Sequence, residues 1–166
     1  MEWIQQNWLV VALGLLVILA LIIVRALGQR TKLPYEPRGK LLTKSEAKFF
    51  HTLQQAAGER WTIFAMVRIA DLLKVKSGTQ KYLSWFNRIS SKHVDFVLCE
   101  GNDLAPKIAI ELDDRSHERP DRQERDRFVN QAFEDAKFPL VRIPTQDDYD
   151  AGNLRTLIEQ AGERFR

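Results

Sequence analysis

The sequence predicts a small mixed α/β (α+β) domain with a twisted mixed sheet, preceded by one transmembrane helix. Three observations support this prediction. An apolar run from Trp8 to Val24 lies near the start of the 166-residue chain. Short β-rich runs alternate with segments of helical periodicity in the remainder. These elements follow the order of an αββ-type core, a helix and a strand, which is typical of two-layer or three-layer α/β domains. The single cysteine excludes a disulfide-stapled fold.

The apolar run is long enough to cross a membrane. Counted from Ile4, it spans roughly 30 Å at about 1.5 Å per residue, which is the thickness of a bilayer core. A cleaved signal peptide and a buried core helix are the alternatives. The start of the chain is not basic, however, and the run ends in bulky residues and Arg25 rather than in a small-residue cleavage site. We therefore expect residues 1–24 to be a retained transmembrane anchor.

The positive charge of the chain lies directly after this run. The formal net charge is +3, and residues 25–44 carry six basic side chains against Glu36. The positive-inside rule therefore predicts a single-pass protein of the inner (cytoplasmic) membrane, with its C-terminal domain in the cytoplasm. Residues from Arg25 to Lys44 would lie against anionic lipid headgroups. A topology signal in a proline-containing linker explains the same charges, and both can hold.

The remaining chain divides into a basic juxtamembrane linker, residues 25–40, and a domain, residues 41–166. Thr43 and Glu46 have the spacing of a capping box and predict the start of the first helix. Later helices show apolar residues on one face, and the strands are short β-rich runs. The expected helices span about 44–57, 79–90, 121–137 and 153–165; the expected strands span 61–67, 93–99, 107–112 and 140–143; residues 69–75 are ambiguous.

The hairpin between the second and third strands brings carboxylates together. Period-two alternation in residues 107–113 puts Glu111 and Asp113 on the same face. Asp95 lies among apolar residues of the preceding strand, where a charge is unfavourable without a partner or ligand. If residues 100–106 form the loop, Asp95 falls opposite Glu111 with Cβ atoms about 5 Å apart. A tighter turn would shift the register and remove this alignment.

Facing carboxylates are destabilising unless something positive lies between them. A hard divalent cation would serve, and Mg²⁺ or Mn²⁺ suits carboxylate oxygens better than zinc, because this group of residues contains no thiolate or histidine pair. The alternative is that Glu111, Asp113 and Asp114 form a solvated strand end while Asp95 pairs with an arginine or lysine. Spacing alone leaves both interpretations open.

Four stretches of the sequence carry a resemblance to a known family. They are KHVDFVLC at 92–99, IELDDRSH at 110–117, RQERDRFV at 122–129 and FPLVRIP at 138–144. Together they resemble the bacterial domain-of-unknown-function family 2726, over about residues 41–149. That family resembles the restriction-endonuclease-like PD-(D/E)XK superfamily, including the very-short-patch-repair type. The resemblance implies a three-layer restriction-endonuclease-like domain that cleaves phosphodiesters with a bound metal.

The resemblance also assigns roles to individual residues. Asp95, Glu111 and Asp113 become the catalytic carboxylates that bind Mg²⁺ or Mn²⁺. Glu46 becomes a supporting acid, although the capping box explains it equally well. His117 becomes a candidate for proton transfer, against the plainer interpretation that it is a surface residue.

One departure from the superfamily pattern affects the expected substrate contacts. Asp113 stands where most members have lysine, so that Lys92, Arg122 or Gln123 would have to contribute the polar or positive contact with DNA or RNA. Residues 60–92 add seven basic side chains against Asp71 alone, interleaved with aromatic residues. Such a surface suits phosphate backbones and bases. An ordinary solvated helix face whose aromatic residues are in the core explains it equally well.

Three classes of function follow from these patterns. The first is a membrane-anchored, metal-dependent nuclease acting on nucleic acid. The second is a catalytically inactive nuclease-fold module that binds nucleic acid or a protein partner at the membrane. The third is a membrane-associated assembly factor with no role on nucleic acid.

Overall fold

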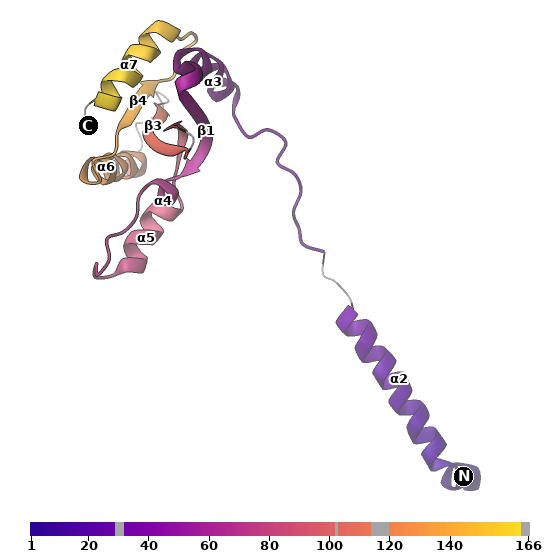
Figure 1. Ribbon diagram of the computed structural model, residues 1–166. Coiled ribbons are helices and arrows are strands. Elements are labelled where there is room, and N and C mark those ends of the chain that lie inside the picture. Colours follow the sequence, from indigo (N-terminus) through magenta and orange to yellow (C-terminus); the bar gives the residue numbers. More distant parts are fainter. Residues whose placement is uncertain (29–31, 102, 114–119, 164–166) are drawn as a thin grey trace. The chain divides into compact units, whose positions relative to one another are not determined.

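The computed structural model describes residues 1–28, 32–101, 103–113 and 120–163 (Figure 1). The chain forms two compact units, Met1–Gly39 and Lys40–Arg166. The first unit contains α1 (Glu2–Gln6) and α2 (Trp8–Gly28). Within α2, Trp8–Ala26 has a mean hydropathy of 3.0 and is not buried in the structure. By length and composition, this helix is apolar enough to span a membrane.

The second unit is a mixed α/β domain built on a four-stranded sheet. The strand order is β1-β2-β3-β4, with β1, β2 and β3 antiparallel and β4 parallel to β3. The mixed α/β class predicted from the sequence is confirmed. The elements of this unit are α3 (Lys44–Ala57), the 3₁₀ turn η1 (Gly58–Arg60), β1 (Trp61–Arg68), α4 (Ile69–Leu72), α5 (Tyr82–Ser90), β2 (His93–Glu100), β3 (Ala105–Asp113), α6 (Pro120–Asp135), β4 (Leu140–Pro144) and α7 (Ala151–Glu163).

Helices cover both faces of this sheet. One apolar cluster joins the sheet to α3 and α7 through buried residues such as Phe49 and Ile158. The other joins the opposite face to α4, α5 and α6 through residues such as Ile89 and Phe133. Every buried apolar residue of the described chain lies between Phe49 and Ile158. The unit that starts at Lys40 therefore contains a complete core of its own.

Local signals account for most element boundaries. At the start of α3, Thr43 Oγ1 accepts the Glu46 N–H and Glu46 Oε2 accepts the Thr43 N–H, so that the predicted capping box is confirmed. The predicted start of the next long helix at residue 79 is wrong, since α5 begins at Tyr82. Lys81, in the left-handed conformation with φ of 56°, interrupts the helix before that point. The ambiguous residues 69–75 form only the short α4.

The hairpin loop is shorter than the sequence predicted, yet the predicted alignment survives. Strand β2 ends at Glu100 and β3 begins at Ala105. Cys99 pairs with Pro106, whereas the predicted loop would have paired it with Lys107. A register shift between Leu98 and Cys99 absorbs the difference, because a bulge adds one residue to one strand only. Beyond the bulge, Phe96 pairs with Ile110, as expected for the longer loop.

Candidate functional site

Glu111 and Asp113 lie on one face of β3, as the alternation predicts. Ile108 and Ile110 belong to the apolar cluster beneath α3 and α7, whereas Ala109 belongs to the cluster beneath α6. Glu111 itself is 9% exposed and is a charged side chain inside the core. The two carboxylates of β3 therefore point toward the α6 layer, where burial makes an uncompensated charge costly.

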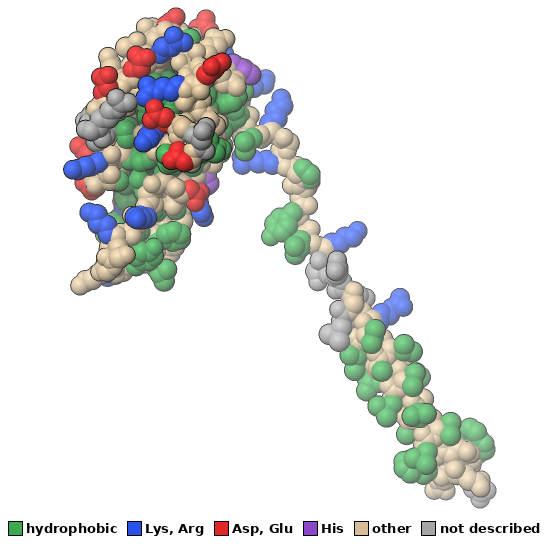
Figure 2. Space-filling model, in the orientation of Figure 1, with side chains coloured by type: hydrophobic (Ala, Val, Ile, Leu, Met, Phe, Trp, Pro, Cys, Tyr) green, Lys and Arg blue, Asp and Glu red, His purple; other side chains and the backbone are tan. Residues whose placement is uncertain are grey.

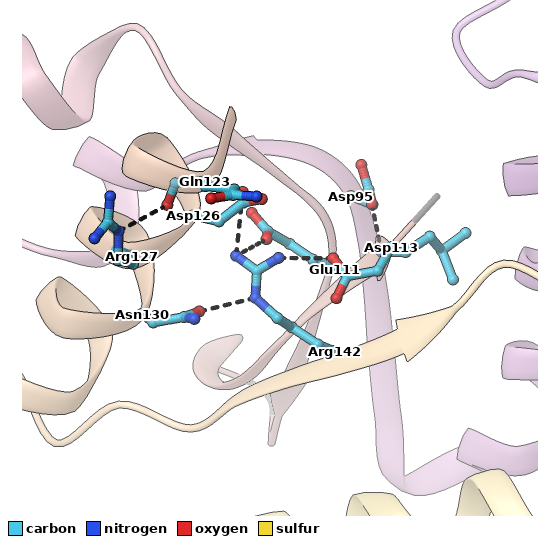
Figure 3. A network of polar contacts seen from close by, with 9 residues as sticks. Asp95, Glu111, Asp113, Gln123, Asp126, Arg127, Asn130 and Arg142 are labelled. Atoms are coloured by element: carbon cyan, nitrogen blue, oxygen red, sulfur yellow. Dashed lines mark hydrogen bonds and ion pairs between the residues drawn. The ribbon is translucent and has the colours of Figure 1, made fainter. Parts of the chain in front are cut away.

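Asp95 lies across the hairpin from these two residues. Its Oδ2 accepts a hydrogen bond of 2.7 Å from the Leu112 N–H, which ties the side chain to the neighbouring strand. The charge of Asp95 raises the pKa of Glu111, and the charge of Asp113 raises the pKa of both. The three predicted carboxylates therefore lie near one another at this end of the hairpin (Figure 3).

A guanidinium group lies between the two carboxylates of β3. Arg142 of β4 is paired in register with Glu111, and its Nη2 lies 2.7 Å from Glu111 Oε2. Its Nη1 donates to Asp113 Oδ1 at 2.6 Å, and its Nε donates to Asn130 Oδ1 at 2.8 Å. Asp126 of α6 lies 3.6 Å from Nη2. In this structure, Arg142 brings positive charge to Glu111 and Asp113 (Figure 3).

The pKa values of Glu111 and Asp95 lie above those of ordinary carboxyl groups. Burial raises the pKa of Glu111 to about 7, against the opposing attraction of Arg142. Burial also raises the pKa of Asp95; the hydrogen bond from Leu112 opposes this shift and the charge of Glu46 adds to it. A carboxyl group with a pKa near neutrality is able to exchange a proton at physiological pH.

Glu46 caps helix α3, which is the alternative to its predicted role as a supporting acid. Its carboxylate accepts the Thr43 N–H at 2.7 Å and completes the capping box of α3. It also lies close enough to Asp95 to raise the pKa of that residue. The first turn of α3 therefore brings a fourth acidic side chain, that of Glu46, toward the site.

The remaining predicted site residues are less closely tied to the carboxylates. Lys92 Nζ donates to the Arg88 carbonyl oxygen at 2.6 Å and lies 5.3 Å from the centre of the Phe128 ring. Burial lowers the pKa of Lys92, with Arg125 and Arg88 adding to the effect.

Gln123 lies exposed on α6, and its carbonyl oxygen accepts a hydrogen bond from Arg127 (Figure 3). His117, together with Asp114, lies outside the described residues. Arg122 belongs to α6, but its side chain is likewise not described.

The donor chemistry of the site suits Mg²⁺ or Mn²⁺, because all candidate ligands are carboxylate oxygens. Within residues 1–28, 32–101, 103–113 and 120–163, however, no group of three or more histidine, cysteine, aspartate or glutamate side chains is arranged to hold a metal ion. The Arg142 guanidinium contacts the carboxylates of both Glu111 and Asp113. A cation at these carboxylates would therefore compete with Arg142.

Sequence reasoning missed three residues of this network, namely Arg142, Asn130 and Asp126. A signal for the first was present in the sequence. Arg142 interrupts the apolar run of β4, and a charge within a buried strand needs a partner of opposite sign. Asn130 and Asp126 left no comparable signal, because polar residues on a helix usually face solvent.

Comparison with known proteins supports one of the sequence-based expectations. The sequence model of the family described as "Protein of unknown function (DUF2726)" matches residues 38–161. No curated protein and no solved structure matches the chain. The match covers the whole sheet, the carboxylate–Arg142 network and the covering helices, apart from the last two residues of α7. The chain therefore belongs to this family of unknown function, DUF2726.

Proposed function

We propose that this chain is a membrane-anchored, divalent-metal-dependent nuclease-like protein that acts on the phosphodiesters of DNA or RNA. The observation that carries this proposal is the proximity of Asp95, Glu111 and Asp113 at one end of the β2–β3 hairpin. The resemblance of the sequence motifs to the restriction-endonuclease-like PD-(D/E)XK superfamily supports it. A mixed sheet with helices on both faces is compatible with that fold.

The side chains have distinct roles under this proposal. Asp95, Glu111 and Asp113 would hold Mg²⁺ or Mn²⁺, which supplies an activated water and neutralises charge on the phosphate. The backbone N–H of Leu112 keeps Asp95 oriented toward β3. Arg142 holds Glu111 and Asp113 in place until the cation competes for them.

A second candidate is a catalytically inactive nuclease-fold module that binds nucleic acid or a protein partner. The ion pairs of Arg142 favour it, since they offset part of the negative charge of Glu111 and Asp113. The two candidates differ in one measurable respect. Only the first requires a divalent cation to displace the guanidinium.

Cleavage assays on the full-length chain in detergent micelles test the first candidate. We expect cleavage of single-stranded or double-stranded DNA or RNA in Mn²⁺ or Mg²⁺, and a loss of about a hundredfold or more in rate for Asp95→Asn and Glu111→Gln. The control is Asp71→Asn, whose carboxylate forms an exposed ion pair with Arg68 away from the site. It should leave the rate unchanged.

Three outcomes separate the candidates. Cleavage lost only in the Asp95 and Glu111 variants supports the nuclease. No cleavage, with a melting temperature that Mn²⁺ still raises, supports the inactive module. No cleavage and no effect of Mn²⁺, together with unfolding of Glu111→Gln, makes Glu111 a structural residue and overturns the nuclease proposal.

The anchoring part of the proposal has its own test. Six basic residues follow the apolar helix, and the positive-inside rule therefore puts the domain on the cytoplasmic side of the inner membrane. In intact spheroplasts, added protease should leave the C-terminal domain uncut, and it should degrade the domain after the membrane is permeabilised. Cleavage of the domain in intact spheroplasts would reverse the orientation.

A further inference from the structure

The helix α5 exposes large apolar side chains to solvent. Leu83 is 71% exposed, and Tyr82 and Trp85 are each 45% exposed. The apolar stripe of this helix is buried only at its C-terminal end, where Ile89 is 7% exposed. In Figure 1, α4 and α5 project from the sheet, on the side away from α3 and α7. The N-terminal half of α5 therefore presents apolar surface without a partner in the described part of the chain.

Basic residues surround this apolar surface. Residues 72–92, which we call the basic segment, contain five lysine or arginine residues and no aspartate or glutamate. Three of these, Lys74, Lys76 and Lys81, are exposed beside α5. Figure 2 shows hydrophobic and basic side chains together at the end of the domain where Figure 1 places α5. A short helix with this combination is typical of a membrane-surface helix.

A groove continues the apolar surface inward. Its volume is about 1140 Å³, and it lies between the basic segment and α6. Its walls include Leu73, Trp85 and Phe128, and Lys74 and Arg88 also line it. The Arg88 guanidinium lies 5.2 Å from the centre of the Trp85 ring and 4.0 Å from that of Phe128. The groove is also lined by Glu124 and Asp135, so that its rim carries both signs, with basic residues in excess. Apolar walls with a mainly basic rim suit an anionic amphiphile, with its charged headgroup above an apolar chain.

We propose that α5 and the basic segment form a docking surface for an anionic lipid bilayer. Leu83, Tyr82 and Trp85 enter the boundary between headgroups and acyl chains, while Lys74 and neighbouring basic residues contact anionic headgroups. This inference does not depend on the nuclease proposal.

Two observations favour a bilayer over nucleic acid as the occupant. The first is the apolar helix α2, which is joined to α3 by residues 29–43, a length of at most about 50 Å when fully extended. If α2 spans a membrane, the domain stays near the lipid at a high effective concentration, so that a weak docking surface is sufficient. The second is Leu83, the most exposed apolar residue of α5, which has no ring on which a base could stack.

Vesicle binding by the fragment 40–166 tests this proposal, because the fragment keeps the complete core and lacks α2. We expect the fragment to sediment with vesicles of phosphatidylcholine that contain phosphatidylglycerol, and to bind vesicles of phosphatidylcholine alone at least tenfold more weakly. Leu83→Ser should lower the partition coefficient about tenfold. The triple variant Lys74→Gln, Lys76→Gln, Lys81→Gln should lower it about a hundredfold, since each basic residue near an anionic surface contributes about fivefold.

Matched controls separate docking from loss of fold. Leu157→Ser changes an apolar residue of α7 that is 43% exposed, and it should leave binding unchanged. All variants should keep the circular dichroism spectrum and melting temperature of the unmodified fragment.

The proposal is overturned if the fragment does not bind anionic vesicles. It is overturned as well if the Leu83 and lysine variants have the same partition coefficient as the unmodified fragment. It is also overturned if single-stranded oligonucleotides, rather than vesicles, bind through the same residues. Nuclease activity that is lost or retained in any variant does not affect these readouts.

Discussion

Replacing Arg142 with alanine is expected to lower the free energy of unfolding by about 3 kcal/mol at pH 8. The substitution leaves Glu111 without the guanidinium that lies 2.7 Å from its carboxylate, and it also removes the 2.6 Å hydrogen bond to Asp113. Removal of one partner of a buried ion pair costs about 3–5 kcal/mol. We expect the lower end of this range, because Nη2 makes no well-directed hydrogen bond among the described residues and Glu111 is able to take up a proton.

The pH dependence of this loss distinguishes charge from packing. Arg142 lowers the pKa of Glu111, so that its removal raises that pKa further, and protonation then relieves the uncompensated charge at low pH. Denaturant unfolding should therefore show a smaller loss at pH 5 than at pH 8, and the double variant Arg142→Ala, Glu111→Gln should recover part of the stability. The control is Arg68→Ala, which breaks a solvent-exposed ion pair and should lower the stability far less than Arg142→Ala does. An equal loss at both pH values would mean that Arg142 stabilises the fold through packing alone.

Replacing Glu111 with glutamine is expected to raise the free energy of unfolding by about 3 kcal/mol at pH 8. The pKa of Glu111 is about 7 in the folded chain and about 4.5 in the unfolded chain, where the carboxyl group is fully solvated. The folded state therefore binds more protons than the unfolded state between these two values, and the contribution of Glu111 to stability falls as pH rises from about 4.5 to 7. Each pKa unit corresponds to about 1.4 kcal/mol, and glutamine removes the titration while keeping the shape of the side chain.

Urea unfolding from pH 4 to pH 8 checks this prediction. The unmodified chain should lose stability across that interval relative to Glu111→Gln, and the difference between the two should reach a plateau above pH 7. Asp148→Asn is the control, because this side chain is 96% exposed and should leave the profile unchanged. A parallel profile for Glu111→Gln would show that Glu111 ionises as freely in the folded chain as in the unfolded one. If Glu111→Gln is more stable than the unmodified chain but no longer cleaves nucleic acid, then Glu111 destabilises the fold and is needed for activity.

The locally encoded features of this chain could be predicted because each depends on neighbouring residues. The capping box of Thr43 and Glu46 lies within one turn of helix, and the shared face of Glu111 and Asp113 follows from the period of a strand. The alignment of Asp95 with Glu111 was predicted from a loop of the wrong length. The bulge at Leu98 and Cys99 restores the predicted register as far as the pair of Phe96 and Ile110, the residues next to Asp95 and Glu111.

The sequence by itself determined the apolar helix α2, the order of helices and strands, the common face of Glu111 and Asp113, and the family to which the chain belongs. Only the tertiary structure decided what lies between those carboxylates. Arg142 comes from β4, which is far along the chain, and it reaches Glu111 because β4 pairs with β3 in parallel. The partner of a buried charge depends on which strands become neighbours in the sheet, and that pairing depends on packing of both sheet faces against the helices rather than on any local pattern.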